Sequence, residues 1–222
     1  MPVPTVRSDL TSIPRYIPGT RAEEVIPDVG GAPIAKLGSN EWPYSPFPEV
    51  VDAIAAAAAD VNRYPDNLAY ELRQALAAFH GVPAKSVWVG SGSSDIIRAT
   101  ALSVGGAANS AVFADPSFVL YPITTMISGA EPIAVPLTAD YRHDLDRMLA
   151  AIRDDTTLVY VCNPNNPTGG HLSGDEVRAF LDHVPESVVV IVDEAYAEFV
   201  NASDYESMVQ TEPDRSNVLT LR

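Results

Sequence analysis

The regular alternation of short apolar runs with helical segments is the feature that most constrains the fold of this 222-residue chain. From about residue 86, apolar runs of strand length recur, and segments with apolar residues at helical spacing fall between most of them. The predicted strands are 86–89, 111–114, 132–135, 158–161, 188–192 and 218–221. The predicted helices are 49–61, 68–79, 93–102, 120–127, 145–152 and 175–184. This order predicts an α/β fold with three layers, in which a mainly parallel sheet has helices on both faces.

The first 47 residues differ from the rest of the chain. They are rich in proline and glycine and show no sustained hydrophobic period, which is typical of an extended arm with turns. Such an arm is usually either frayed or wrapped on a partner. Regular patterning begins at Pro48, a residue that suits the first turn of a helix. The sequence therefore predicts an N-terminal arm over residues 1–47 and a domain over residues 48–222.

Composition narrows the classes of function. The net charge of −15 argues against nucleic acid and against anionic membrane surfaces as partners. The longest apolar block, residues 53–59, is far shorter than the roughly 20 residues that a membrane span requires. No signal peptide is visible, so a cytoplasmic protein is expected. The histidines show no metal-ligand spacing, and Cys162 is expected to be a buried strand residue rather than a nucleophile.

Three loops at the predicted carboxyl ends of strands carry side chains suited to a ligand. In Gly90–Asp95, glycines and helix N–H groups suit a phosphate, although a plain glycine turn with a helix cap is an equal explanation. Asn163–Gly169 is more specific, because two prolines and a glycine fix the loop so that Asn166 can aim its amide at a ligand. Asp193 ends a very apolar strand, where a carboxylate needs a cation or donors, and a protonated pyridine nitrogen is such a partner.

With these motifs in view, the chain resembles the histidinol-phosphate aminotransferase family within the fold-type I pyridoxal 5′-phosphate (PLP) enzymes. The resemblance covers essentially the whole chain. It rests on the segments Ile13–Gly19, Leu37–Pro43, Asn62–Asp66, Asn163–Gly169 and Asp193–Tyr196. It implies that residues 48–222 form an incomplete PLP-binding large domain, which lacks its C-terminal part and the small domain.

The resemblance implies how four side chains would hold the cofactor ring. Asp193 would pair with the pyridine nitrogen and make the ring a better electron sink. Asn166 and Tyr196 would form hydrogen bonds to the 3′-oxygen of the ring, and Asn166 would also face the substrate. Phe118 falls where the family places an aromatic side chain that stacks on the ring face.

The same resemblance implies roles for five further residues. Ser93 and Ser94 would hold the cofactor phosphate with their backbone and hydroxyl groups. Tyr64 would reach across a homodimer to the cofactor phosphate of the partner. Tyr16 and Trp42 would line the substrate site. These roles make a homodimer the expected assembly of the full-length protein.

PLP-dependent amino transfer also requires a lysine that binds the cofactor as a Schiff base. In the family, a strand like residues 217–222 continues into Thr-x-Ser-Lys, whereas the two lysines of this chain, Lys36 and Lys85, lie far upstream. No catalytic residue is therefore assigned. The sequence is expected to be truncated before the lysine, and the chain by itself is expected not to transaminate.

The leading interpretation is an aminotransferase of histidine biosynthesis that moves an amino group between histidinol phosphate and 2-oxoglutarate. The alternatives within the family are an aromatic amino-acid aminotransferase and, more distantly, a threonine-phosphate decarboxylase. A second class is a non-catalytic, truncated module that binds PLP without forming an imine. A doubly wound nucleotide-binding protein would explain the alternation of strands and helices, but not Asn163–Gly169 or Asp193–Tyr196.

Overall fold

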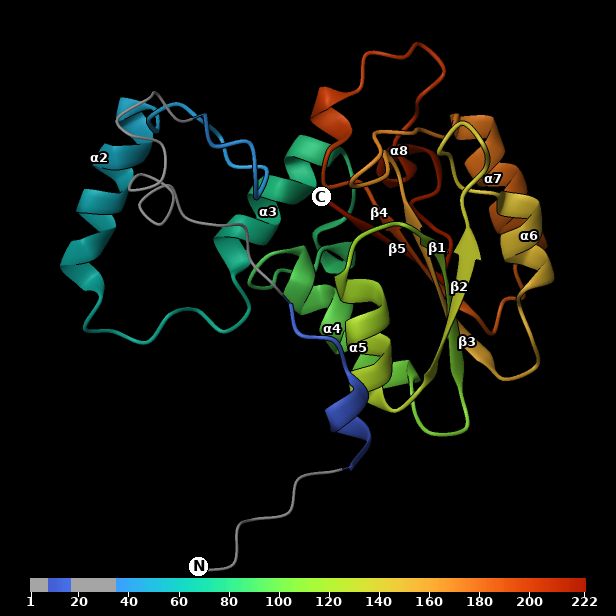
Figure 1. Ribbon diagram of the computed structural model, residues 1–222. Helices are drawn as coiled ribbons and strands as arrows, with labels where there is room; N and C mark the ends of the chain where they lie inside the picture. The colour runs from blue at the N-terminus through green and yellow to red at the C-terminus, as the bar shows by residue number, and fades with distance from the viewer. Residues whose placement is uncertain (1–7, 17–34) are drawn as a thin grey trace, which may run out of the picture. The chain divides into compact units, whose positions relative to one another are not determined.

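The computed structural model describes residues 8–16 and 35–222 (Figure 1). These residues group into two compact units, one formed by residues 8–14 with 70–222 and the other by residues 15–16 with 35–69. Residues 1–7 and 17–34 of the predicted arm lie outside the described residues. The predicted division into an arm of residues 1–47 and a domain of residues 48–222 stays a prediction.

In the smaller unit, the described residues contain one α-helix. α2 spans Pro48–Ala57, and the 3-10 turn η3 (Ala58–Asp60) continues it. Pro48 lies in the first turn, where its missing N–H group removes no hydrogen bond of the helix. The helix predicted over residues 49–61 is thus confirmed, although its last turn is of the 3-10 type.

The larger unit is built on a five-stranded sheet in the order β2-β1-β3-β4-β5, in which every neighbouring pair is parallel. The strands are β1 (Ser110–Asp115), β2 (Glu131–Pro136), β3 (Thr156–Cys162), β4 (Val189–Asp193) and β5 (Val218–Leu221). They confirm five of the predicted strands. Because all five are parallel, the loops that follow them meet at one edge of the sheet.

Helices cover both faces of this sheet (Figure 1). The helices and 3-10 turns of the larger unit are η1 (Ser8–Ser12), α3 (Tyr70–His80), η4 (Ala84–Ser86), α4 (Ser93–Val104), α5 (Leu120–Ser128), α6 (Leu145–Ala150), α7 (Gly174–His183), η5 (Ala197–Phe199) and α8 (Met208–Thr211). Side chains of α4 and α5 pack on one face, and those of α6, α7 and α8 pack on the other. The predicted three-layer α/β architecture is confirmed. Among the described residues, no helix has the length and apolar character that a membrane crossing needs.

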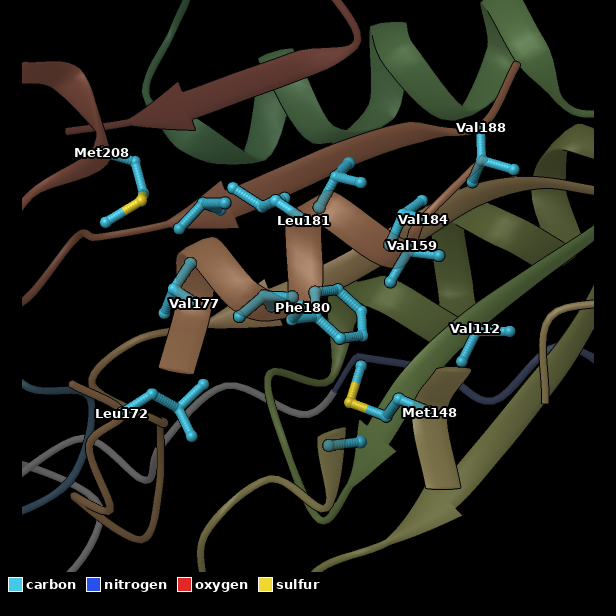
Figure 2. Close-up of a cluster of buried hydrophobic side chains, with 14 of the residues drawn as sticks. Val112, Met148, Val159, Leu172, Val177, Phe180, Leu181, Val184, Val188 and Met208 are labelled. Carbon is cyan, nitrogen blue, oxygen red and sulfur yellow. The ribbon is translucent and has the colours of Figure 1, made fainter. Parts of the chain in front are cut away.

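Alternate residues of the strands β1, β3 and β4 contribute to two separate cores. On one face, Val159 and Val161 of β3 pack with Phe180 of α7, in the cluster that Figure 2 shows. On the other face, Tyr160 of β3 packs in a second cluster with Ile97 of α4. Successive side chains of a strand point to opposite faces, so a strand buried on both faces is apolar throughout. This is why the sequence shows continuous apolar runs.

The strand predicted at residues 86–89 is wrong. The turn η4 ends at Ser86, and Val87 has extended dihedral angles, with φ −98° and ψ 125°. However, this segment joins no sheet among the described residues. A strand is defined by the neighbour that accepts and donates its backbone hydrogen bonds, and local sequence reports only the preference for an extended backbone.

A capping box begins α7 and offers a test of the local structure. Ser173 Oγ accepts the N–H of Glu176 at 3.2 Å, and Glu176 Oε2 accepts the N–H of Ser173 at 2.8 Å. Ser173→Ala is expected to lower the free energy of unfolding by about 1 kcal/mol, measured by urea denaturation. Ser173→Thr keeps the hydroxyl and serves as the control, with an expected loss of less than roughly 0.5 kcal/mol. Equal losses in the two variants would contradict this role.

Candidate active site

The strand order places the loops that carry two predicted site residues at a reversal of the sheet topology. β2 lies on one side of β1, and β3 lies on the other side. Sheets of this type bind ligands beyond the carboxyl ends of their strands, at such a switch point. Phe118 follows β1 and Asn166 follows β3. The structure therefore brings the loops of these two predicted site residues to the same position at the edge of the sheet.

The asparagines of Asn163–Gly169 have different tasks. Asn163 is 1% exposed, and its side chain forms two hydrogen bonds with the backbone of Leu172. Its Oδ1 accepts the Leu172 N–H at 2.8 Å, and its Nδ2 donates to the Leu172 oxygen at 3.1 Å. Asn166 is half-buried, and its side-chain amide forms no hydrogen bond with any residue that the structure describes. The amide of Asn166 is therefore available to a ligand, as the sequence predicts.

Asn165 ties this loop to the loop after β1. Its Oδ1 accepts from Ser117 Oγ at 2.7 Å, and its Nδ2 donates to the Pro116 oxygen at 3.1 Å. His143 Nε2 lies 3.1 Å from the same Oδ1, and because an amide oxygen only accepts, Nε2 carries the proton. Burial lowers the pKa of His143 to about 4, so its imidazole is neutral at pH 7. The network fixes both loops without adding a charge to them.

The contrast between Asn163 and Asn166 gives a testable expectation. Asn163→Ala is expected to lower the free energy of unfolding by about 2 kcal/mol, because it leaves the buried N–H and C=O of Leu172 without partners. Asn166→Ala is the matched control from the same loop and is expected to change stability by less than roughly 0.5 kcal/mol. Urea denaturation of both variants measures the difference. Similar losses would mean that Asn166 is also part of the scaffold.

Asp193 is a buried carboxylate at the end of β4, with a side chain that is 3% exposed. Tyr121 Oη donates to Oδ2 at 2.8 Å, and the N–H of Ala195 donates to Oδ1 at 3.2 Å. Burial raises the pKa of Asp193, and these two donors act in the opposite direction. Within the described part of the chain, Asp193 forms no ion pair. A cationic ligand would supply the charge that its neutral partners do not.

Tyr121 is the site residue that the sequence reasoning missed. It is 0% exposed and donates its hydroxyl to Asp193. Its ring meets Phe118 edge-on, with centroids 5.6 Å apart and an interplanar angle of 85°, and it stacks on Tyr160 at 4.6 Å. Tyr121 thus contacts two predicted site residues at once. Its spacing in the sequence could have identified it, because Tyr121 follows Phe118 by three residues at the start of a predicted helix and so lies on the same helix face.

The N-terminus of α4 differs slightly from the prediction. The cap expected from the serines lies at Gly92, which has φ 76° and no side-chain cap. Asp95 instead accepts the Ser91 N–H with Oδ2 at 3.2 Å. Ser93 and Ser94 are the first two residues of the helix, and their N–H groups have no acceptor among the described residues, whereas the N–H of Asp95 donates to the Gly92 oxygen at 3.2 Å. These groups suit an anion, as the sequence predicts for a phosphate.

The turn after β4 carries Tyr196, which is half-buried next to η5. A second carboxylate, Glu194, is fully buried and holds this turn in place. It accepts from Ser207 Oγ at 2.5 Å, from the Met208 N–H at 2.7 Å and from Arg222 Nη1 at 3.1 Å. Burial raises the pKa of Glu194, while its donors lower it. Glu194 thus has a cationic partner, Arg222, whereas Asp193 has none among the residues that the structure describes.

Three of the predicted residues belong to the smaller unit. They are Tyr16, Trp42 and Tyr64. Within that unit the ring of Trp42 meets the ring of Tyr44 edge-on, with centroids 5.3 Å apart. The substrate contacts predicted for Tyr16 and Trp42, and the contact across a dimer predicted for Tyr64, stay predictions.

The chemistry of this donor set fits a planar cofactor with a cationic ring nitrogen and an anionic group. The larger unit presents a buried carboxylate with neutral partners, an uncommitted amide, an aromatic side chain and first-turn N–H groups, from Asp193, Asn166, Phe118 and α4. Among the described residues, no group of three or more His, Cys, Asp or Glu side chains could hold a metal ion. The site is therefore suited to PLP, the cofactor expected from the sequence.

Comparisons with known proteins agree with this geometry. The family model described as aminotransferase class I and II matches residues 32–222. An aromatic amino acid aminotransferase of Rhodococcus jostii (strain RHA1) is 46% identical over 219 residues, which cover 99% of this chain and 58% of that protein. The protein of the same name from Streptomyces coelicolor is 42% identical over 220 residues, covering 99% of this chain and 60% of that protein.

A solved structure shows the same fold with the cofactor bound. Histidinol-phosphate aminotransferase from Sinorhizobium meliloti, in complex with pyridoxal-5′-phosphate, superposes with a TM-score of 0.84 at 29% identity. The match covers 97% of this chain and 57% of that chain. The chain thus spans roughly three fifths of the length of the relatives that it matches. Because the family model matches most of its residues, the chain belongs to the class I and II aminotransferases, with the α/β fold of the fold-type I PLP enzymes.

Proposed function

We propose that the protein is a PLP-dependent aminotransferase that acts on aromatic amino acids. The observation that carries the reaction class is Asp193, a buried carboxylate with two neutral donors at the carboxyl edge of a parallel sheet. Support for the substrate class comes from relatives of 46% and 42% identity that are named aromatic amino acid aminotransferases.

In this proposal, each site side chain has one task. Asp193 pairs with the ring nitrogen, and Asn166 donates its amide to the 3′-oxygen of the ring together with the hydroxyl of Tyr196. Phe118 covers one face of the ring, and the first turn of α4, with Ser93 and Ser94, binds the phosphate. PLP, when bound, supplies the electron sink for chemistry at the amino-acid α-carbon.

The histidinol-phosphate function expected from the sequence receives less support. The structural relative with that name is 29% identical, whereas the relatives named for aromatic substrates are more than 40% identical. The aromatic function, which the sequence offered as an alternative, therefore replaces it, and histidine biosynthesis is not proposed. The homodimer, 2-oxoglutarate as amino acceptor and a cytoplasmic location stay predictions.

The lysines of the chain lie outside the site loops. Lys85 is an exposed residue of η4, and Lys36 belongs to the smaller unit, where it pairs with Glu41. We therefore propose that these 222 residues by themselves bind PLP without an imine and do not transaminate. After binding of PLP and removal of the free cofactor, treatment with borohydride is expected to leave the mass of the chain unchanged. A gain equal to one reduced PLP on Lys36 or Lys85 would contradict this proposal.

The substrate is tested on the protein as its own cell makes it. With 2-oxoglutarate as acceptor, kcat/KM for phenylalanine and tyrosine is expected to exceed that for histidinol phosphate by at least about tenfold, because a pocket that fits one side chain discriminates by 1–3 kcal/mol or more. A preference for histidinol phosphate would restore the function first expected from the sequence. Loss of activity in Asp193→Asn with every substrate would show that the measured reaction belongs to this site.

A further inference from the structure

We propose that Tyr121 is a positioning residue that acts through Asp193, fixing the orientation of its carboxylate and holding it as the anion. The inference rests on the proposed function only for the identity of the cation that Asp193 meets. Tyr121 itself lies beneath the site: its ring is fully buried between Phe118 and Tyr160. Its effect is therefore transmitted by one hydrogen bond.

Two donors from different elements define the orientation of the carboxylate. Tyr121 Oη of α5 approaches Oδ2 at 2.8 Å, and the N–H of Ala195 approaches Oδ1 at 3.2 Å. Each oxygen has a protein donor, so rotation of the carboxylate breaks at least one hydrogen bond. The ring of Tyr121 cannot follow such a rotation easily, because Tyr160 stacks on it with an interplanar angle of 18°.

The hydroxyl of Tyr121 favours the ionised form of Asp193. Burial, followed by the charges that Cys162 and Asp193 can carry, raises the pKa of Tyr121 well above its ordinary value, so the phenol keeps its proton at neutral pH. A hydrogen bond donated to a carboxylate stabilises the anion and opposes the effect of burial. Without it, burial shifts the proton toward Asp193 Oδ1 or Oδ2, and a protonated acid offers no charge to a ring nitrogen. The hydroxyl thus influences whether a shared proton lies on Asp193 or on its ligand.

The two other titratable side chains in the core around Tyr121, those of Cys162 and Tyr160, are neutral at pH 7, and the adjacent Glu194 pairs with Arg222. Cys162 of β3 is in register with Asp193, and burial raises the pKa of its thiol to about 11. Tyr160 has its hydroxyl within 3.5 Å of Thr124 and 3.4 Å of Thr125, so it is occupied elsewhere. Among the described residues, Tyr121 is the side chain that forms a hydrogen bond with the Asp193 carboxylate.

The test compares two buried tyrosines that stack on each other. Tyr121→Phe removes the hydroxyl at Asp193, and Tyr160→Phe removes a hydroxyl of equal size from the same stack. In the cofactor-free protein, the 13C signal of the Asp193 carboxyl is followed against pH. The midpoint is expected to move to higher pH in Tyr121→Phe and to stay in place in Tyr160→Phe. The dissociation constant of PLP is expected to rise roughly tenfold in Tyr121→Phe, because one charge-assisted hydrogen bond to Asp193 is lost.

An unchanged midpoint in Tyr121→Phe would overturn the proposal and leave Tyr121 as a packing residue. If that variant does not fold, 3-fluorotyrosine at position 121 replaces it, because its more acidic phenol is a stronger donor. The midpoint of Asp193 is then expected to move to lower pH, and an unchanged midpoint would again overturn the proposal. Since the titration uses neither cofactor nor substrate, its failure is distinguishable from a failure of the aminotransferase assignment.

Discussion

Asp193→Asn is expected to stabilise the cofactor-free protein at neutral pH and, in the same molecule, to lower kcat/KM by roughly 10²–10³-fold. Both effects follow from the same buried charge. Asparagine keeps the shape of the side chain: its oxygen can accept the Ala195 N–H and its Nδ2 can donate to Tyr121 Oη, but it carries no charge. Activity falls because removal of one preorganised electrostatic contact at the reacting centre has about this effect. Stability rises by about 1 kcal/mol, because an ionised carboxylate with neutral partners is unfavourable in the interior.

The pKa of Asp193 determines how the stability difference between Asp193→Asn and the unmodified protein varies with pH. Burial raises the pKa of Asp193 in the folded protein above the ordinary value of 3.8. Its contribution to stability is therefore fully present below that ordinary pKa and is lost as the pH rises through the folded pKa. The difference between Asp193→Asn and the unmodified protein is expected to be smallest in acid and to grow toward neutral pH. Glu194, whose pKa burial also raises, is present in both proteins and does not affect the difference.

Urea denaturation between pH 4 and pH 8 measures this difference, and steady-state kinetics on the protein as its own cell makes it measures the activity. Asp115→Asn is the matched control, because Asp115 is an exposed aspartate at the end of β1, another parallel strand of the same sheet. It is expected to change stability by less than roughly 0.5 kcal/mol at every pH. A stability gain that does not vary with pH would show that the charge of Asp193 is not its cause.

Phe180→Ala is expected to lower the free energy of unfolding by about 3–5 kcal/mol. Phe180 is 2% exposed and lies in the core between α7 and the sheet, where Figure 2 shows it among Val177, Val159 and Met148. Truncation removes most of the side chain and leaves a cavity that the strands on the other side cannot fill. A loss of this size is a large part of the stability of an ordinary domain.

Phe79→Ala provides the control for Phe180→Ala. The chemical change is the same and Phe79 also lies on a helix, α3, but its side chain is 80% exposed. The expected change in free energy of unfolding is below about 0.5 kcal/mol. Urea denaturation with equal slopes for the two variants would confirm that only the native state is affected. Equal losses of unfolding free energy in both variants would mean that burial of Phe180 in the core of Figure 2 does not contribute to stability.

The local hydrophobic pattern of the sequence was sufficient to predict most of the helices and strands. The apolar runs around Val112, Val159 and Val190 are long enough and isolated enough to be recognised as strands that are buried on both faces. The failure at residues 86–89 has a physical cause. Val87 adopts the extended backbone that the sequence favours, yet no described strand pairs with it. Pairing depends on segments that are distant along the chain, and no short window contains that information.

Within the site, the sequence determined the types of residue but not their partners. The composition of Asn163–Gly169 and the position of Asp193 after an apolar strand indicated a ligand-binding edge from residue order alone. Only the fold decided that Asn163 and Asn165 form the scaffold while Asn166 keeps its amide available. The three side chains are chemically identical, so burial and neighbouring backbone groups alone distinguish them.

The sequence by itself determined an α/β chain with parallel strands, a fixed asparagine-proline loop and a strand-end carboxylate that needs a partner. The tertiary structure decided the strand order, which places the loops after β1 and β3 at the switch point, and the contact of Tyr121 with Asp193, two residues 72 positions apart. The physical reason is the range of the interactions. Hydrophobic period and turn chemistry act over a few residues, whereas the charge and orientation of a buried carboxylate depend on whatever the packed core brings beside it.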